Sequence, residues 1–127
     1  PVSVMNFIEG TRFTQEKHDK QQSPYDELLK PKAGGIAFVL DAMGDYLNAV
    51  VNVTIYYPEG IPSFGDFISG KVNTIEVTIE TMPISEDLKG DYFNDRATKI
   101  NFQKWVNQLW ADKALTMQTL KSNNREL

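Results

Sequence analysis

Apolar and polar residues follow a strand-like pattern in three stretches of the 127-residue sequence. In residues 72–82 isoleucine and valine alternate with glutamate and threonine, so we expect a strand with one apolar and one solvated face. Residues 49–57 are almost continuously apolar, which is typical of an interior strand. Residues 2–8 form a third apolar run with β-branched side chains, and we expect a short strand there that ends at Glu9 and Gly10.

Two other stretches repeat their apolar residues every three or four positions, which predicts helices. The first begins near Pro31 and runs for about three to four turns, and Gly44 can end it early. The second should continue to about Lys121, before a polar tail at 122–127 that frays. A single helical turn is expected at 64–68, whereas the polar segment 11–30 should be irregular. The second helix carries an apolar stripe of Ile100, Phe102, Trp105, Val106, Leu109 and Trp110.

This order of elements predicts an α/β fold, with helices packed on a small mixed sheet. Three strands make a small sheet, so we expect residues 1–127 to be an incomplete part of a larger α/β domain. The chain also begins at Pro1, without a methionine, and enters an apolar stretch at once. Both features favour a piece of a longer protein.

Composition narrows the classes of function. The chain is 41% hydrophobic and 24% charged, which is typical of a folded domain. Its net charge of −4 and the lack of a basic stripe argue against a nucleic-acid partner. It has no cysteine and one histidine, so a zinc site is excluded, and we expect no metal. No apolar run reaches the ~18 residues that would cross a bilayer, so we expect this chain itself to be soluble.

The segment Phe7-Ile8-Glu9-Gly10-Thr11-Arg12 is the one short motif with chemical meaning. Gly10 lets the backbone approach a ligand closely, and the planar fork of Arg12 matches a phosphate group. Thr11 can donate a hydroxyl hydrogen bond, while Glu9 can accept one from a glycerol hydroxyl or hold Arg12 in place. The plain alternative is a solvated Glu9–Arg12 pair, with Gly10 serving only a turn.

Lys32 is a second candidate for phosphate binding, and a solvated lysine in the first turn of a helix is the equally simple alternative. These interpretations gain weight from a resemblance. The motif is similar to the Phe-x-Glu-Gly-Thr/Ser-Arg block of the glycerol-3-phosphate and lysophosphatidic acid acyltransferase family. Residues 29–37 and 51–58 resemble the next two blocks of that family, in the same order, and the final helix with Asp112-Lys113 resembles one bacterial branch.

The resemblance implies that residues 1–127 are the C-terminal, acceptor-binding part of a bacterial acyltransferase domain. Such an enzyme transfers an acyl group from acyl-CoA or acyl carrier protein to a hydroxyl of a glycerol-phosphate or lysophospholipid. It uses no bound cofactor. The resemblance further implies that the complete protein associates with the cytoplasmic face of the inner membrane, and that Glu9, Gly10, Thr11, Arg12 and Lys32 bind the acceptor.

The catalytic base of that family is missing from this sequence. The family uses a His-x4-Asp motif that precedes the block, in which the aspartate orients the histidine as a general base. The sole histidine, His18, follows the block, and Ser23 stands five residues after it. We therefore interpret His18 as an exposed loop residue, assign no catalytic residue, and expect the chain alone to be inactive.

Two alternatives to an acyltransferase portion remain open. A non-catalytic module would use the same loop to bind anionic lipid headgroups or phosphorylated small molecules. An interaction domain would use the apolar stripe of the final helix, although core packing is the more ordinary use of such a stripe.

Overall fold

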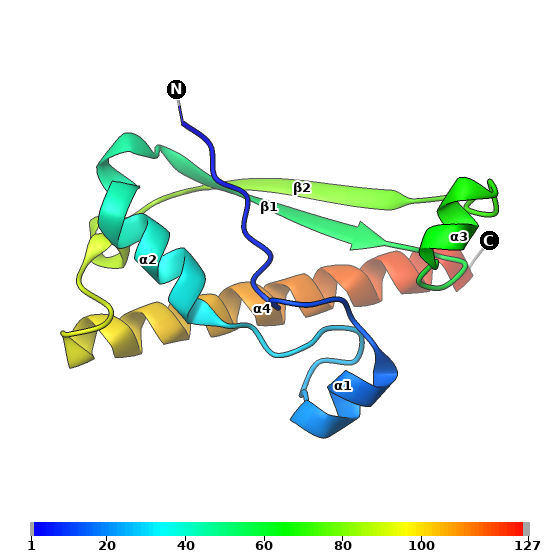
Figure 1. The fold of residues 1–127 in the computed structure, drawn as a ribbon, viewed down its shortest axis with the longest axis horizontal. Coiled ribbons are helices and arrows are strands. Elements are labelled where there is room, and N and C mark those ends of the chain that lie inside the picture. The colour runs from blue at the N-terminus through cyan, green and yellow to red at the C-terminus, as the bar shows by residue number, and fades with distance from the viewer. Residues whose placement is uncertain (1, 126–127) are drawn as a thin grey trace.

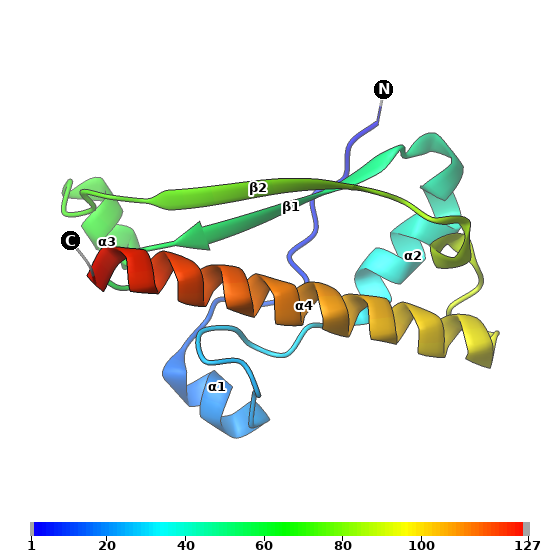
Figure 2. The ribbon, with the colours of Figure 1, turned by 180° about the vertical axis from the view of Figure 1, so that it is seen from behind.

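Residues 2–125, which the computed structural model describes, fold as helices on a two-stranded sheet. The sheet pairs β1 (Ala49–Tyr56) with β2 (Glu76–Pro83), and the long helix α4 (Arg96–Arg125) runs beside it over the length of the molecule (Figures 1 and 2). Helix α2 (Ala33–Met43) lies at one end, and α1 (Gln15–Gln21) lies on the side of α4 away from the sheet. The predicted α/β class, with helices packed on a small sheet, is confirmed.

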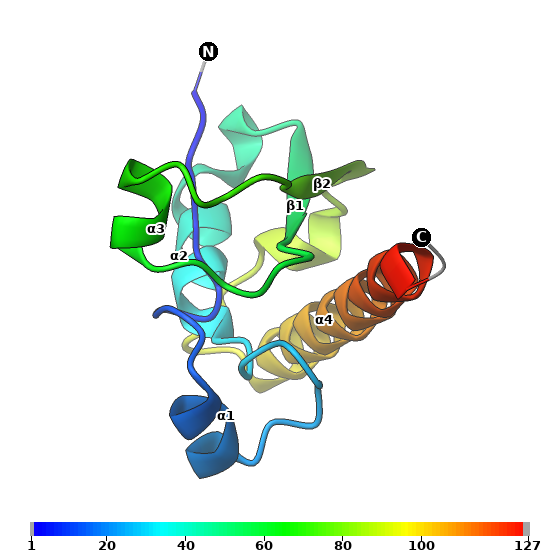
Figure 3. The same ribbon diagram turned by 90° about the vertical axis from the view of Figure 1, so that its right-hand side faces the viewer.

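The third predicted strand, at residues 2–8, is wrong. This segment is irregular in structure, and its apolar side chains at Val2, Val4, Met5 and Phe7 are exposed. Viewed end-on, it descends past α2 toward α1 rather than beside β1 or β2 (Figure 3). A β-branched sequence forms a strand only where a neighbouring strand takes its backbone hydrogen bonds, and none does so within the described residues.

The sheet is antiparallel and exposes an apolar face. Val53 pairs with Ile79 and Ile55 with Val77, and residues directly opposite one another share a face. These four side chains and that of Val51 are between 43% and 65% exposed, whereas Thr54 and Tyr56 on the other face of β1 are buried. The strands predicted at 49–57 and 72–82 are present as residues 49–56 and 76–83, so residues 72–75 are irregular instead of extended in the sheet. Strand β1 is not an interior strand, and the apolar face of β2 is not buried.

The core lies between α4 and α2. Phe102 and Val106 of α4 are each 1% exposed and pack with Ile36, Ala37 and Leu40 of α2. Leu88 and Tyr92 complete this cluster, the former from the short 3-10 helix Glu86–Lys89. Leu109 and Trp110 form a second cluster with Leu28. Five residues of the predicted stripe thus form a packing surface, whereas Ile100 is 42% exposed. The hypothesis that the stripe is an exposed interaction face is wrong.

The helical predictions differ from the structure mainly in their bounds. Helix α2 starts at Ala33, and a 3-10 turn, Gly44–Tyr46, follows it at the glycine expected to end it. The short helix α3 (Phe64–Ile68) is confirmed, and Ser63 and Asp66 cap it. Helix α4 continues past Lys121 to Arg125, so residues 122–125 are helical, and the rest of the predicted tail lies outside the described residues.

Helix α1 interrupts the segment 11–30, where the sequence predicts an irregular backbone; residues 11–14 and 22–30 are irregular, as predicted. The Thr14 hydroxyl accepts the Lys17 backbone N–H at 3.2 Å, which caps the helix, and Gln22 ends it with a left-handed φ of 51°. None of the helices described between residues 2 and 125 is long and apolar enough to cross a membrane.

Candidate functional site

The predicted phosphate motif forms an exposed turn between the N-terminal segment and α1. The Gly10 N–H donates to the Phe7 carbonyl at 2.9 Å, and Gly10 takes a left-handed φ of 74° that side chains rarely adopt. The Lys32 N–H donates to the Ile8 carbonyl at 2.8 Å, which joins this turn to the start of α2. A Cβ atom added at Gly10 would lie 3.4 Å from Lys32 Nζ, so the ammonium group sits beside the glycine.

Lys17, which sequence reasoning did not single out, binds the same turn from α1. Its Nζ donates to Thr11 Oγ1 at 2.8 Å and to the Arg12 carbonyl at 3.2 Å. The side chains of Arg12, Lys17 and Lys32 take part in no ion pair with any described residue. The ammonium groups of Lys17 and Lys32 therefore lie at residues 9–12, which we call the 9–12 loop, and Arg12 belongs to the loop itself. None of the three pairs with a described carboxylate.

Glu9 attaches the 9–12 loop to Leu29 instead of pairing with Arg12. Its Oε1 accepts the backbone N–H of Leu29 at 3.1 Å, and the residue is half-buried. Burial raises the pKa of the Glu9 carboxyl, although the Leu29 N–H, the Lys113 ammonium and the Trp110 indole oppose that shift. The solvated Glu9–Arg12 pair considered from the sequence is absent from the described residues.

Lys113 and Trp110 of α4 extend this anchor to the sheet. Trp110 donates its indole N–H to the Leu29 carbonyl at 3.0 Å, and Lys113 Nζ donates to the Val53 carbonyl of β1 at 2.7 Å. The Lys113 ammonium also lies 5.1 Å from the centre of the Trp110 ring. Burial lowers the pKa of Lys113, and Glu9 partly offsets that shift. These contacts hold the 9–12 loop against α4 and β1.

His18 lies on α1, half-buried, and not in an exposed loop as predicted. Its Nε2 is hydrogen bonded to the Tyr25 carbonyl, and its ring contacts that of Phe13 at 5.8 Å between centres. A general base needs a free ring nitrogen that faces its substrate. The carbonyl accepts from Nε2 alone, and Nδ1 lies 3.6 Å from Asp19 Oδ1, so the absence of a catalytic role for His18 stays a prediction.

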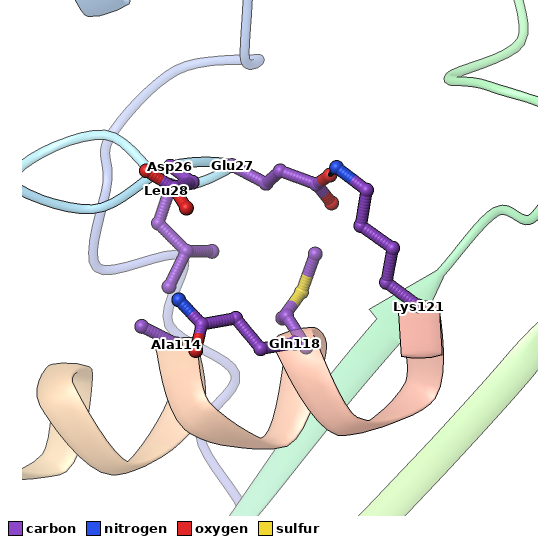
Figure 4. A pocket seen from close by; sticks show the side chains of 7 residues that line it. Asp26, Glu27, Leu28, Ala114, Gln118 and Lys121 are labelled. Atoms are coloured by element: carbon purple, nitrogen blue, oxygen red, sulfur yellow. Dashed lines mark hydrogen bonds and ion pairs between the residues drawn. The ribbon is translucent and has the colours of Figure 1, made fainter. Parts of the chain in front are cut away.

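Two hollows of the surface are lined by residues outside the 9–12 loop. One is lined by residues 26–28 and by α4, and Glu27 and Lys121 point toward one another across it with Nζ and Oε1 2.9 Å apart (Figure 4). Another is lined by residues around α3, from Tyr57 to Thr74. Among residues 2–125 no group of three or more His, Asp or Glu side chains is placed to hold a metal ion.

Comparisons with known proteins point to one class, the acyltransferases. The chain is similar to lysocardiolipin acyltransferase 1 of Danio rerio, with 26% identity over 137 residues that cover 93% of this chain and 31% of that protein. The enzymes of that name from Mus musculus and Gallus gallus are 28% and 23% identical, and each alignment covers 89% of this chain. The chain spans about a third of the length of these relatives.

No family model matches the chain, and no solved structure matches it significantly. The relatives support the predicted likeness to acyltransferases, at low identity. The bacterial branch and the lysophosphatidic acid acceptor stay predictions, as do the roles of the five site residues.

Proposed function

We propose that this chain is the acceptor-binding portion of a glycerolipid acyltransferase. The 9–12 loop would hold the phosphate of a glycerol-phosphate or lysophospholipid, so that a glycerol hydroxyl faces the acyl donor. The observation that carries this proposal is the Gly10 turn, where the Lys32 ammonium lies beside the glycine and the exposed Arg12 follows two residues later, free of any ion pair among the described residues.

The chemistry of the turn suits a phosphate. A guanidinium donates two parallel N–H bonds to phosphate oxygens, and an ammonium adds a compact positive charge. Gly10 leaves the backbone bare where the ligand would approach, and the Thr11 hydroxyl adds a neutral donor. Glu9 faces the other way, into the contact with Leu29. We therefore assign Glu9 to holding the loop, and Thr11, Arg12 and Lys32 to contact with the acceptor.

Acyl transfer needs a general base, and this chain supplies none in that role. We propose that the base, with the contacts to acyl-CoA or acyl carrier protein, comes from another part of a longer protein. The association of that protein with the cytoplasmic face of a membrane is part of the same proposal. The similarity to relatives about three times longer supports this division of labour.

A binding experiment tests the acceptor site on the 127-residue chain itself. Titration with sn-glycerol 3-phosphate, followed by NMR, should shift the amide signals of the 9–12 loop. Arg12→Ala should weaken binding by roughly 10- to 100-fold, because a charged hydrogen bond is lost. Arg96→Ala, at an exposed arginine at the start of α4, is the matched control and should bind like the parent chain. Equal binding by both variants would exclude Arg12 from the site.

An activity experiment tests the enzyme assignment. The 127-residue chain should show no acyl transfer from acyl-CoA to glycerol 3-phosphate or lysophosphatidic acid. A longer protein that contains this chain should do so, and Arg12→Ala in it should lower kcat/KM for the acceptor. If the longer protein binds the acceptor without turnover, the second candidate function, a non-catalytic module for anionic headgroups, is favoured. The presence of the binding motif without the family's His-x4-Asp base motivates that candidate.

A further inference from the structure

Lys17 occupies an unusual place for a surface lysine. It lies in the first turn of α1, is partly buried, and makes two hydrogen bonds to the 9–12 loop and no ion pair with a described residue. A solvated lysine usually extends into water, because fixing its long side chain costs rotamer entropy. The Lys17 ammonium instead donates hydrogen bonds to two consecutive residues, Thr11 and Arg12. These bonds offset the entropy cost and hold the loop in one position.

We propose that Lys17 is a positioning residue for the acceptor-phosphate site, an inference that rests on the function proposed above. By binding the Arg12 carbonyl, the ammonium fixes the peptide plane from which the guanidinium projects. By donating to Thr11 Oγ1, it occupies a lone pair of that hydroxyl. The Thr11 hydrogen then stays available to donate to a phosphate oxygen.

Helix α1 is built to hold Lys17 in place. Thr14 caps the helix at the Lys17 N–H, and His18, the next residue, is tied to the Tyr25 carbonyl. Asp19, two positions after Lys17 on α1, accepts a hydrogen bond from the Gln15 side-chain amide at 2.9 Å instead of from Lys17. Glu9 faces Leu29. The ammonium therefore pairs with no described carboxylate and retains one N–H that neither loop bond uses.

The inference is tested by titrating the 127-residue chain with sn-glycerol 3-phosphate. Lys17→Met should weaken binding about three- to tenfold. Lys20→Met removes a lysine from the same helix that makes no side-chain bond to the loop, and it should leave the dissociation constant unchanged. Lys17→Arg, which keeps the charge and the donors, should recover most of the affinity. If circular dichroism shows that Lys17→Met does not fold, Lys17→Arg is titrated in its place.

A double-mutant cycle separates positioning from charge alone. Thr11→Val removes the hydroxyl that Lys17 binds, so Lys17→Met should cost less affinity in that background than in the parent chain. An equal loss in both backgrounds, or a Lys17→Met variant that binds like the parent, would overturn the inference. If Arg12→Ala also binds like the parent, the proposed function fails as well. If Arg12→Ala alone loses binding, only the role of Lys17 is refuted.

Discussion

Glu9 and Leu29 lie 20 positions apart in sequence, and the carboxylate of the first accepts the backbone N–H of the second at 3.1 Å. Leu29 is fully buried, and its carbonyl accepts the indole N–H of Trp110. Two side chains thus satisfy both backbone polar groups of one core residue. Because Glu9 is committed to this contact, the acidic residue of the motif anchors the loop while Arg12 stays exposed.

Replacing Glu9 by alanine should destabilise the chain by about 1–3 kcal/mol, because the buried Leu29 N–H would lose its partner. Glu9→Gln keeps an acceptor at that position and should cost less. Glu16→Ala, at an exposed residue of α1, should change the free energy of unfolding by less than about 0.5 kcal/mol. Urea denaturation measures all three. Equal stabilities for Glu9→Ala and Glu16→Ala would show that the Leu29 contact contributes nothing.

The Glu9 carboxyl should also make stability depend on pH. Its pKa in the folded chain lies above the usual value, so the folded state binds the proton more tightly than the unfolded state does. Between the ordinary and the raised pKa, the free energy of unfolding should therefore fall as pH rises. Glu9→Gln removes this dependence. Urea denaturation of both proteins from about pH 4 to 7 gives the difference between their free energies of unfolding. If the value for the parent chain minus that for Glu9→Gln increased with pH, the raised pKa of Glu9 would be contradicted.

The two apolar surfaces of the fold should respond differently to substitution. Phe102→Ala, in the core between α2 and α4, should cost about 3–5 kcal/mol of unfolding free energy. Val53→Thr and Ile79→Thr keep β-branched residues on the exposed sheet face and should each cost about 0.5 kcal/mol or less. The double variant should also self-associate less in sedimentation velocity, because it reduces an exposed apolar patch. A large loss of stability would show that this face is covered.

Periodicity in the sequence predicted the helices that bury one apolar face in the core. Helix α2 and the stripe of α4 follow from apolar residues at helical spacing, and both pack as that spacing requires. The pattern failed where the outcome depends on a neighbour. The run at 2–8 has strand-forming residues without a strand beside it, and the alternation in β2 does not reveal which face a helix covers. Helix α1 has seven residues, too few to show a period, and only Thr14 marked its start.

The candidate site was predictable as a motif but not as a set of contacts. Gly10 and Arg12 were singled out because few residue types take a left-handed turn or fork to a phosphate. Sequence reasoning missed Lys17 and Lys113. A lysine in a polar segment, or one that follows an aromatic stripe, is normally interpreted as a solvated residue. Their roles depend on the Thr11 hydroxyl and the Val53 carbonyl, and only the folded chain brings these groups to them.

The bond between Trp110 and Leu29 spans 81 positions, so it has a consequence for synthesis on the ribosome. The nascent polypeptide displays the residues of the 9–12 loop early, yet the indole that secures their support is translated much later. Until α4 has left the exit tunnel, the Leu29 carbonyl lacks its hydrogen bond from Trp110, and the support of the 9–12 loop is incomplete. Assembly of the 9–12 loop therefore waits for the synthesis of Trp110, and a ribosome stalled before the codon for Trp110 should leave residues 2–30 open to protease.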